Sequence, residues 1–263
     1  MKLKYRYYVD TWARDETQGL KSLTRRIRNC EVEFLFDDGH KLRAIDILIP
    51  NASVTYSTGG TIQPLDKSND AEAHIIANYI VNVLQEETGK CDIIKTPDTP
   101  EYVSETPEEK TLLEGKVFTR TRSIFANAII SGSINFSEKI LNKYIKQIDA
   151  FAIYSDAKRM TNPVGKFREF FRVLEHFFPY EGEEFDRKAS KYFGKYDSKF
   201  TEKFVYRLRQ LRNRCTHAKK NYITSNDIEG MDQVKTKLKD IHTMAKLLIN
   251  NPPRLKILSR RGT

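Results

Sequence analysis

The spacing of apolar side chains divides the chain into a strand-forming first part and a helix-forming second part. In residues 30–36, polar and apolar side chains alternate with the period of two that is typical of a half-buried strand. Residues 37–40, Asp-Asp-Gly-His, favour a turn, and residues 42–49 are again rich in branched apolar side chains, so this stretch predicts a β-hairpin. Residues 4–9 and 53–65 predict further strands.

Helical spacing appears at residue 70 and dominates the chain from residue 117 onward. Residues 70–87 carry apolar side chains three and four positions apart, and Asp70 is placed to cap this helix. Four more predicted helices follow: from Ser137 to before Asn162, residues 167–178, residues 198 to about 216, and Asp227 to about 249. Amphipathic helices of this length bury their apolar stripes against one another in a bundle.

The composition changes between these two parts. Residues 89–115 contain three prolines, many acidic side chains and few large apolar ones, which predicts an exposed linker. We therefore expect an α+β chain with four segments: a mainly-β N-terminal domain with a following helix at 1–88, an acidic proline-containing linker at 89–115, an all-α helical bundle at 116–253, and a basic tail at 254–263.

Charge is distributed as unevenly as the secondary structure. Residues 1–115 hold 14 Lys/Arg and 20 Asp/Glu, a net of −6, whereas residues 116–263 hold 31 and 15, a net of +16. A domain this basic attracts polyanions, of which nucleic acid is the commonest, so RNA becomes a candidate partner. The alternative is a lysine-rich helical surface that does no more than face solvent.

The cysteines and the apolar runs indicate the compartment. Cys30, Cys91 and Cys215 are odd in number and far apart, which fits a reducing cytoplasm better than a disulfide framework or a metal knuckle. No stretch approaches the roughly 20 apolar residues that span a bilayer. No apolar region that would make a signal peptide follows the basic start of the chain. We expect a cytoplasmic protein without membrane contact.

The candidate chemistry lies in the segment LRQLRNRCTHAKK, at the end of the third helix of the second part. The chain has no Gly-rich phosphate loop, no HExxH motif and no GxSxG elbow. Imidazole titrates near neutral pH, so His217 suits proton transfer in RNA cleavage, while the guanidinium of Arg212 suits a phosphate that gains negative charge. Asn213 can orient a phosphate oxygen or the imidazole. The alternatives are a surface charge for Arg212 and a helix C-terminal cap for His217.

This segment resembles the motif of the HEPN superfamily, and the helices around it resemble those of Apea-like and MauJ-like HEPN domains. HEPN ribonucleases share an arginine, often a polar residue next to it, and a histidine a few positions later; these match Arg212, Asn213 and His217. The Phe-rich helix KFREFFRVLEHFFP adds to the resemblance, which covers about residues 136–253. It implies a helical bundle and a metal-independent endoribonuclease with no cofactor and no metal ligands, in bacterial antiviral defence or toxin-like growth control.

Other residues are expected to support this site. The candidate nucleic-acid-binding residues are Arg207, Arg209, Arg214, Lys219 and Lys220, and the candidate supporting carboxylates are Glu169 and Glu175. We expect Cys215, within the motif, to pack as a small side chain and not to act as a nucleophile.

The spacing of the motif raises a geometric question. Five positions along an ideal helix rotate by about 140°, so Arg212 and His217 would not share one face of a continuous helix. Either the helix loosens before His217, or two chains assemble the site around a two-fold axis, as HEPN nucleases commonly do. We expect a homodimer through the helical domain. Alternative functions are a non-catalytic HEPN module that binds RNA or a nucleotide, and a protein-interaction adaptor.

Overall fold

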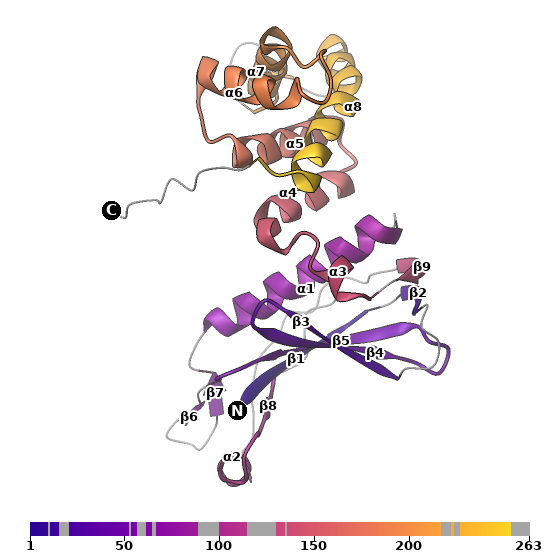
Figure 1. Cartoon of the computed structure of the whole chain (residues 1–263), viewed down its shortest axis with the longest axis vertical. Helices are drawn as coiled ribbons and strands as arrows, with labels where there is room; N and C mark the ends of the chain where they lie inside the picture. Colours follow the sequence, from indigo (N-terminus) through magenta and orange to yellow (C-terminus); the bar gives the residue numbers. More distant parts are fainter. Residues whose placement is uncertain are drawn as a thin grey trace. The chain divides into compact units, whose positions relative to one another are not determined.

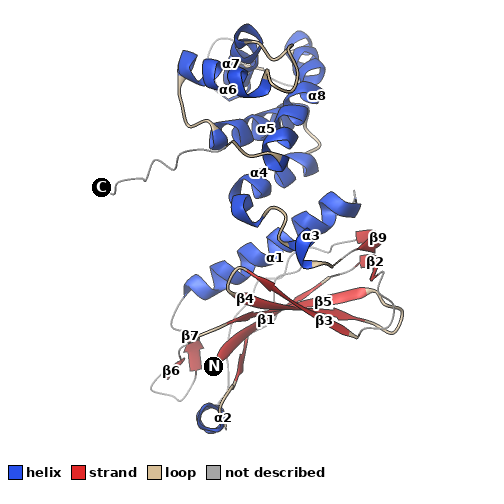
Figure 2. Ribbon diagram, viewed as in Figure 1, coloured by secondary structure: helices blue, strands red, loops and turns tan. Residues whose placement is uncertain are grey.

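The chain folds into two compact units, Met1–Lys146 and Gln147–Thr263 (Figure 1). The computed structural model describes residues 1–9, 11–15, 21–52, 54–56, 62–64, 67–88, 100–114, 130–134, 136–216, 222–223 and 227–253. The first unit holds the described strands together with helices α1 to α3, and the second holds helices α4 to α8 (Figure 2). This arrangement confirms the predicted α+β class, with a sheet in the N-terminal part and helices in the C-terminal part.

A five-stranded antiparallel sheet forms the centre of the first unit, in the order β3-β4-β5-β1-β8. The strands are β1 (Lys2–Tyr8), β3 (Ser22–Ile27), β4 (Cys30–Phe36), β5 (Leu42–Ile49) and β8 (Glu101–Val103). Two smaller pairs accompany them: β2 (Thr11–Asp15) runs parallel to β9 (Ile130–Ile134), and β6 (Val54–Tyr56) runs antiparallel to β7 (Ile62–Pro64). The predicted hairpin of residues 30–49 is confirmed as β4 and β5, which pair directly.

Helix α1 (Lys67–Thr88) lies along one face of this sheet (Figure 1). Alternation along β1 turns Leu3, Tyr5 and Tyr7 into the core, and α1 buries a stripe that includes Ile76 and Ile80. The helix begins three residues before Asp70, so Asp70 is not its N-cap. Its carboxylate instead accepts a hydrogen bond of 2.5 Å from the Tyr5 hydroxyl, which ties the helix to the sheet.

The segment expected to be an exposed linker is partly folded. Strand β8 pairs with β1 at the edge of the sheet, and helix α2 (Pro107–Leu113) follows it, capped by the Thr106 side chain. The acidic side chains here contact the basic residues of β1: Glu101 pairs with Lys4, and Glu105 lies 3.3 Å from Lys2. Pairing with a distant strand, which the local composition does not reveal, gives residues 101–103 their strand conformation, whereas most side chains of residues 100–114 are exposed.

The predicted helix that starts at Ser137 divides into several pieces. Ser137 does cap a helix, α3 (Glu138–Leu141), but a turn follows, then a short 3-10 helix, η1 (Ile145–Gln147), and then α4 (Ile148–Arg159). The break falls where the backbone N–H of Tyr144 donates to the Tyr79 hydroxyl of α1, at 3.2 Å. The ring of Phe136 packs against Phe34 and Phe36 of β4. Residues 136–146 therefore belong to the first unit, whereas the sequence placed the start of the helical domain at 116.

The second unit contains five described α-helices around an aromatic core. They are α4, α5 (Pro163–Phe177), α6 (Gly182–Phe193), α7 (Glu202–Thr216) and α8 (Ile228–Asn250). Helices α5, α7 and α8 have bounds similar to those predicted from the sequence. Asp227 caps α8 as expected, because its carboxylate accepts a hydrogen bond from the N–H of Gly230. Helix α6 was missed, because its buried apolar side chains are only Phe185, Ala189 and Phe193, among strongly polar neighbours.

Candidate nucleic-acid site on α7

Helix α7 carries most of the candidate residues and is anchored by a narrow apolar stripe. Its N-terminus is capped by Thr201, whose hydroxyl accepts from the N–H of Phe204 at 3.2 Å. The buried positions are Val205, Leu208, Leu211 and Cys215, so the four arginines between them point away from the core in different directions. The helix is described as far as Thr216. His217, Lys219 and Lys220 lie outside the described residues.

Arg212 is partly buried and held by a carboxylate on α5. Its Nη2 atom lies 2.9 Å and 3.1 Å from the two carboxylate oxygens of Glu175. Its Nη1 lies 3.5 Å from Oδ1 of Asn213, which is a long contact. Its Nε is buried and has no hydrogen-bond partner among the described residues. The structure thus brings together Arg212, Asn213 and Glu175, three of the candidate residues. The Nε donor of Arg212 is enclosed without a partner in the part of the chain that the structure describes.

Glu169, the second candidate carboxylate, makes a different set of contacts. Its side chain is buried and lies 3.2 Å from Nε of Arg168 and 2.6 Å from Nη1 of Arg172, both on its own helix. One buried carboxylate therefore orients two exposed arginines. Sequence analysis did not select these arginines, although a helix places Arg172, three positions after Glu169, on the same face as the acid.

Two of the arginines expected to contact nucleic acid have acidic partners within the unit. Arg209 forms a two-pronged pair with Asp186 of α6, at 2.9 Å and 2.6 Å, and Asp186 is only 2% exposed. Hydrogen bonding to Asp186 raises the pKa of Arg209. Arg214 lies 3.3 Å from Asp227, the cap of α8, and 2.8 Å from Gln233. Both arginines stabilise the packing of α7 against its neighbours.

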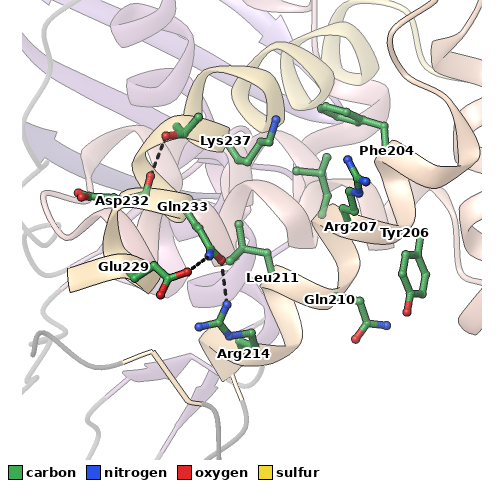
Figure 3. A pocket seen from close by; sticks show the side chains of 12 residues that line it. Phe204, Tyr206, Arg207, Gln210, Leu211, Arg214, Glu229, Asp232, Gln233 and Lys237 are labelled. Atoms are coloured by element: carbon green, nitrogen blue, oxygen red, sulfur yellow. Dashed lines mark hydrogen bonds between the residues drawn. The ribbon is translucent and has the colours of Figure 1, made fainter. Parts of the chain in front are cut away.

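Arg207 differs from the other arginines of α7. It is exposed, and among the described residues it has no hydrogen bond or ion pair. It lines a groove between α7 and α8, where Figure 3 shows it beside Phe204. Of the described arginines that had been assigned to nucleic-acid binding, Arg207 is the one whose donors are all available to a ligand.

Cys215 lies within the motif but is buried. Burial raises the pKa of its thiol to about 11, even though the charges of Arg214, Arg168 and Arg212 act in the opposite direction. The thiol is therefore protonated at neutral pH and is a poor nucleophile. This agrees with the interpretation of Cys215 as a packing residue.

The comparisons with known proteins add no relative. No family model, no curated protein and no solved structure matches the chain. The HEPN resemblance thus rests on the residues themselves. Within the described part of the chain, no three His, Cys, Asp or Glu side chains gather in a possible metal site. None of the described helices has both the length and the apolar character needed to cross a bilayer.

Proposed function

We propose that the second unit is an endoribonuclease of the HEPN type that cleaves RNA without a metal ion. The observation that carries the proposal is the state of Arg212: a guanidinium at the end of α7 that is 21% exposed and that Glu175 orients. A guanidinium held in this way offers its exposed N–H groups to a phosphate oxygen. The unit is also basic, with 25 Lys/Arg and 14 Asp/Glu in residues 147–263.

The proposed reaction needs only proton transfer and charge stabilisation. The 2′-oxygen of the substrate attacks the adjacent phosphorus, the bond from phosphorus to the 5′-oxygen breaks, and a 2′,3′-cyclic phosphate forms. His217 takes the proton from the 2′-hydroxyl, and the imidazolium that forms gives a proton to the departing 5′-oxygen. Arg212 stabilises the negative charge that builds up on the phosphate, and Asn213 orients one of its oxygens. Bacterial defence or growth control is the biological setting that the resemblance implies.

We further propose that the active form is a two-fold dimer through the helical unit. An ideal helix separates positions 212 and 217 by about 140°, whereas a two-fold axis can bring Arg212 of one chain to His217 of the other. Mixing two inactive variants, Arg212→Gln and His217→Asn, tests this arrangement. Each mixed dimer would regain one intact site and part of the activity. A mixture that stays inactive under conditions of subunit exchange argues against sites shared between chains.

The test of the function itself is RNA cleavage in the presence of EDTA. The wild-type chain should cut single-stranded RNA and leave 2′,3′-cyclic phosphate ends. Arg212→Gln and His217→Asn should each lower the rate by about 100-fold or more. Arg187→Gln, which removes an exposed arginine of α6, is the matched control and should keep the wild-type rate. Loss of cleavage in EDTA with recovery on adding Mg²⁺ would overturn the mechanism.

A non-catalytic module that binds RNA or a nucleotide is the second candidate, and the unpaired Arg207 beside a groove favours it. The same assay separates the two functions. Salt-sensitive RNA binding by the wild-type chain without any cleavage, and unchanged in His217→Asn, identifies a binding module. No affinity for RNA at low salt would favour a protein-interaction adaptor.

A further inference from the structure

The described residues include three buried carboxylates, and Glu169 differs from the other two in what its ion pairs connect. Asp46 holds Arg6 and so joins β5 to β1. Asp186 holds Arg209 and joins α6 to α7. Both partners of Glu169 lie on its own helix, α5. Among the described residues, the ion pairs of Glu169 therefore join no two elements of the fold.

The stability of the unit does not account for a buried acid at this position. Glu169 is 6% exposed, and a charge removed from water loses solvation that only well-placed donors replace. An ion pair between residues of one helix contributes little to stability. A buried carboxylate can, however, hold cationic side chains in one fixed orientation, as the supporting residues of a binding site do.

The two arginines held by Glu169 keep most of their donors. Arg168 uses only its Nε, at 3.2 Å from one carboxylate oxygen, and Arg172 uses only its Nη1, at 2.6 Å from the other. Their remaining N–H groups have no partner among the described residues, and the two side chains are 40% and 53% exposed. Because two guanidinium groups share one carboxylate, one positive charge is left over at the surface.

Arg168 and Arg172 lie on the same stripe of α5 as Glu175. Positions 168, 172 and 175 are four and three residues apart, the spacing at which side chains of a helix lie on one face. Glu175 pairs with Arg212 of α7 at 2.9 Å. The stripe of cations therefore leads along α5 to the guanidinium that holds the scissile phosphate in the proposed reaction.

Two hollows in the surface border this stripe. One, of about 460 Å³, is lined by Arg168, by Arg159 of α4 and by Cys215 of the motif. The other, of about 420 Å³, is lined by Arg172, Glu169 and again Arg159. The two hollows are neighbours because they share Arg159, and the first of them reaches the motif at the end of α7. A chain of anionic groups can thus follow the cations from the motif along α5.

We propose, on the basis of the function proposed above, that Arg168 and Arg172 bind phosphates of the RNA strand beside the scissile phosphate, with Glu169 orienting both. A guanidinium with a fixed orientation can bind phosphate oxygens through two N–H groups at once. A row of cations matches the repeated phosphates of a strand. Because these contacts lie away from the reacting atoms, they strengthen substrate binding and do not change the chemical step.

The first test is the kinetics of RNA cleavage by the full chain with one arginine replaced at a time. Glu169 then keeps its other partner, so the buried charge is not left alone. Arg168→Gln and Arg172→Gln should each raise KM for a single-stranded dodecamer by about fivefold, with kcat within about twofold of the wild type. Arg187→Gln, which removes an exposed arginine from α6, is the control and should leave both constants unchanged.

Substrate length separates a contact with the strand from a change in the active centre. A dinucleoside phosphate has only the scissile phosphate, so its cleavage should not depend on Arg168 or Arg172. Equal loss of activity on the dinucleoside phosphate and on the dodecamer would show that these arginines act on the fold or on the reaction, and it would overturn the proposal.

The second test measures binding without cleavage. A dodecamer with 2′-O-methyl groups cannot form the cyclic phosphate, so fluorescence anisotropy gives its affinity at several salt concentrations. Each phosphate contact with a single strand contributes about 0.7 to the slope of log affinity against log salt concentration. Arg168→Gln and Arg172→Gln should each lower this slope by about that amount, whereas Arg187→Gln should not change it.

Glu169→Gln tests the role of the buried carboxylate. The substitution adds one unit of positive charge to the unit, so attraction by charge alone would strengthen RNA binding. Loss of the fixed orientation should instead weaken binding by about threefold or more. Tighter binding by Glu169→Gln overturns the proposal. If the wild type cuts no RNA, the proposed function fails; if it cuts RNA and both arginine variants keep the wild-type KM and salt slope, only the assignment of Arg168 and Arg172 fails.

Discussion

Replacing Arg209 by glutamine should destabilise the helical unit, although sequence analysis assigned this residue to RNA binding. The Asp186 carboxylate beside it is 2% exposed, and both of its oxygens accept from Arg209. In Arg209→Gln, this buried charge loses its counterion. Breaking a buried ion pair costs about 3–5 kcal/mol when one partner is left behind.

The structure places the expected cost at or just below the lower limit of that range. The Arg209 side chain is 19% exposed, and the shorter glutamine side chain can still donate one hydrogen bond. We therefore expect a loss of about 2–3 kcal/mol in the free energy of unfolding. With a urea dependence of about 2 kcal/mol per molar, the unfolding midpoint should fall by about 1 M or more.

The assay is urea unfolding followed by circular dichroism, with hydrogen exchange of the α6 and α7 amides to show that the helical unit is the part affected. Arg207→Gln is the matched control. It removes the same charge from an exposed position and should change stability by less than about 0.5 kcal/mol.

Replacing both partners of the pair provides a second check. Asp186→Leu combined with Arg209→Met should recover most of the lost stability, because no buried charge is then left unpaired. The reasoning is refuted if Arg209→Gln is as stable as Arg207→Gln. It is also refuted if Arg209→Gln keeps full stability and loses RNA affinity.

Three further predictions concern other groups. Burial raises the pKa of the Cys30 and Cys215 thiols to about 11. A Cys91→Ser variant keeps only these two thiols, so it should resist thiol labelling at pH 8 until urea unfolds it. Rapid labelling of the native variant would contradict the burial of both thiols. Tyr79→Phe leaves the Tyr144 N–H without its acceptor and should cost about 1–2 kcal/mol, with faster hydrogen exchange at that amide; unchanged exchange would show that the bond is not formed. If Arg212 binds the reacting phosphate, Glu175→Gln should lower kcat by about 10- to 100-fold with little change in KM; an effect on KM alone would place Arg212 outside the reaction.

The sequence predicted those elements whose causes are local. The alternation in residues 30–36 and the turn chemistry of 37–40 are sufficient for the hairpin of β4 and β5. The cap at Asp227 and the apolar stripe after it are sufficient for α8. In each case a short stretch of chain contains both the signal for the element and the signal for its end.

Other elements depend on partners that are distant in sequence. Strand β8 has three residues in an acidic, proline-containing stretch, and only pairing with β1 makes it a strand. The helix expected from Ser137 breaks because a hydroxyl from α1 takes up the Tyr144 N–H. Neither contact can be recognised from the local sequence pattern. Tyr79 and Tyr144 are 65 positions apart, and β8 pairs with the first strand of the chain.

The same limit applies to the candidate site. The motif at the end of α7 drew attention to Arg212, and the structure places Glu175 against it. The motif gave no means of distinguishing among the other three arginines of this helix, Arg207, Arg209 and Arg214. Arg209 pairs with Asp186 of α6, and Arg214 pairs with Asp227 at the start of α8. Helix α6 was not predicted from the sequence, so the partner of Arg209 could not be found there.

Net charge alone therefore overstates the positive field along α7. Of its four arginines, Arg209, Arg212 and Arg214 each lie within about 3.3 Å of a carboxylate on another part of the unit. A paired guanidinium attracts a distant phosphate weakly, because the field of its partner cancels most of its own. An isolated one keeps its full charge and all of its donors. On this helix that residue is Arg207, so it contributes more to the positive field along α7 than any of the three arginines that are paired with a carboxylate.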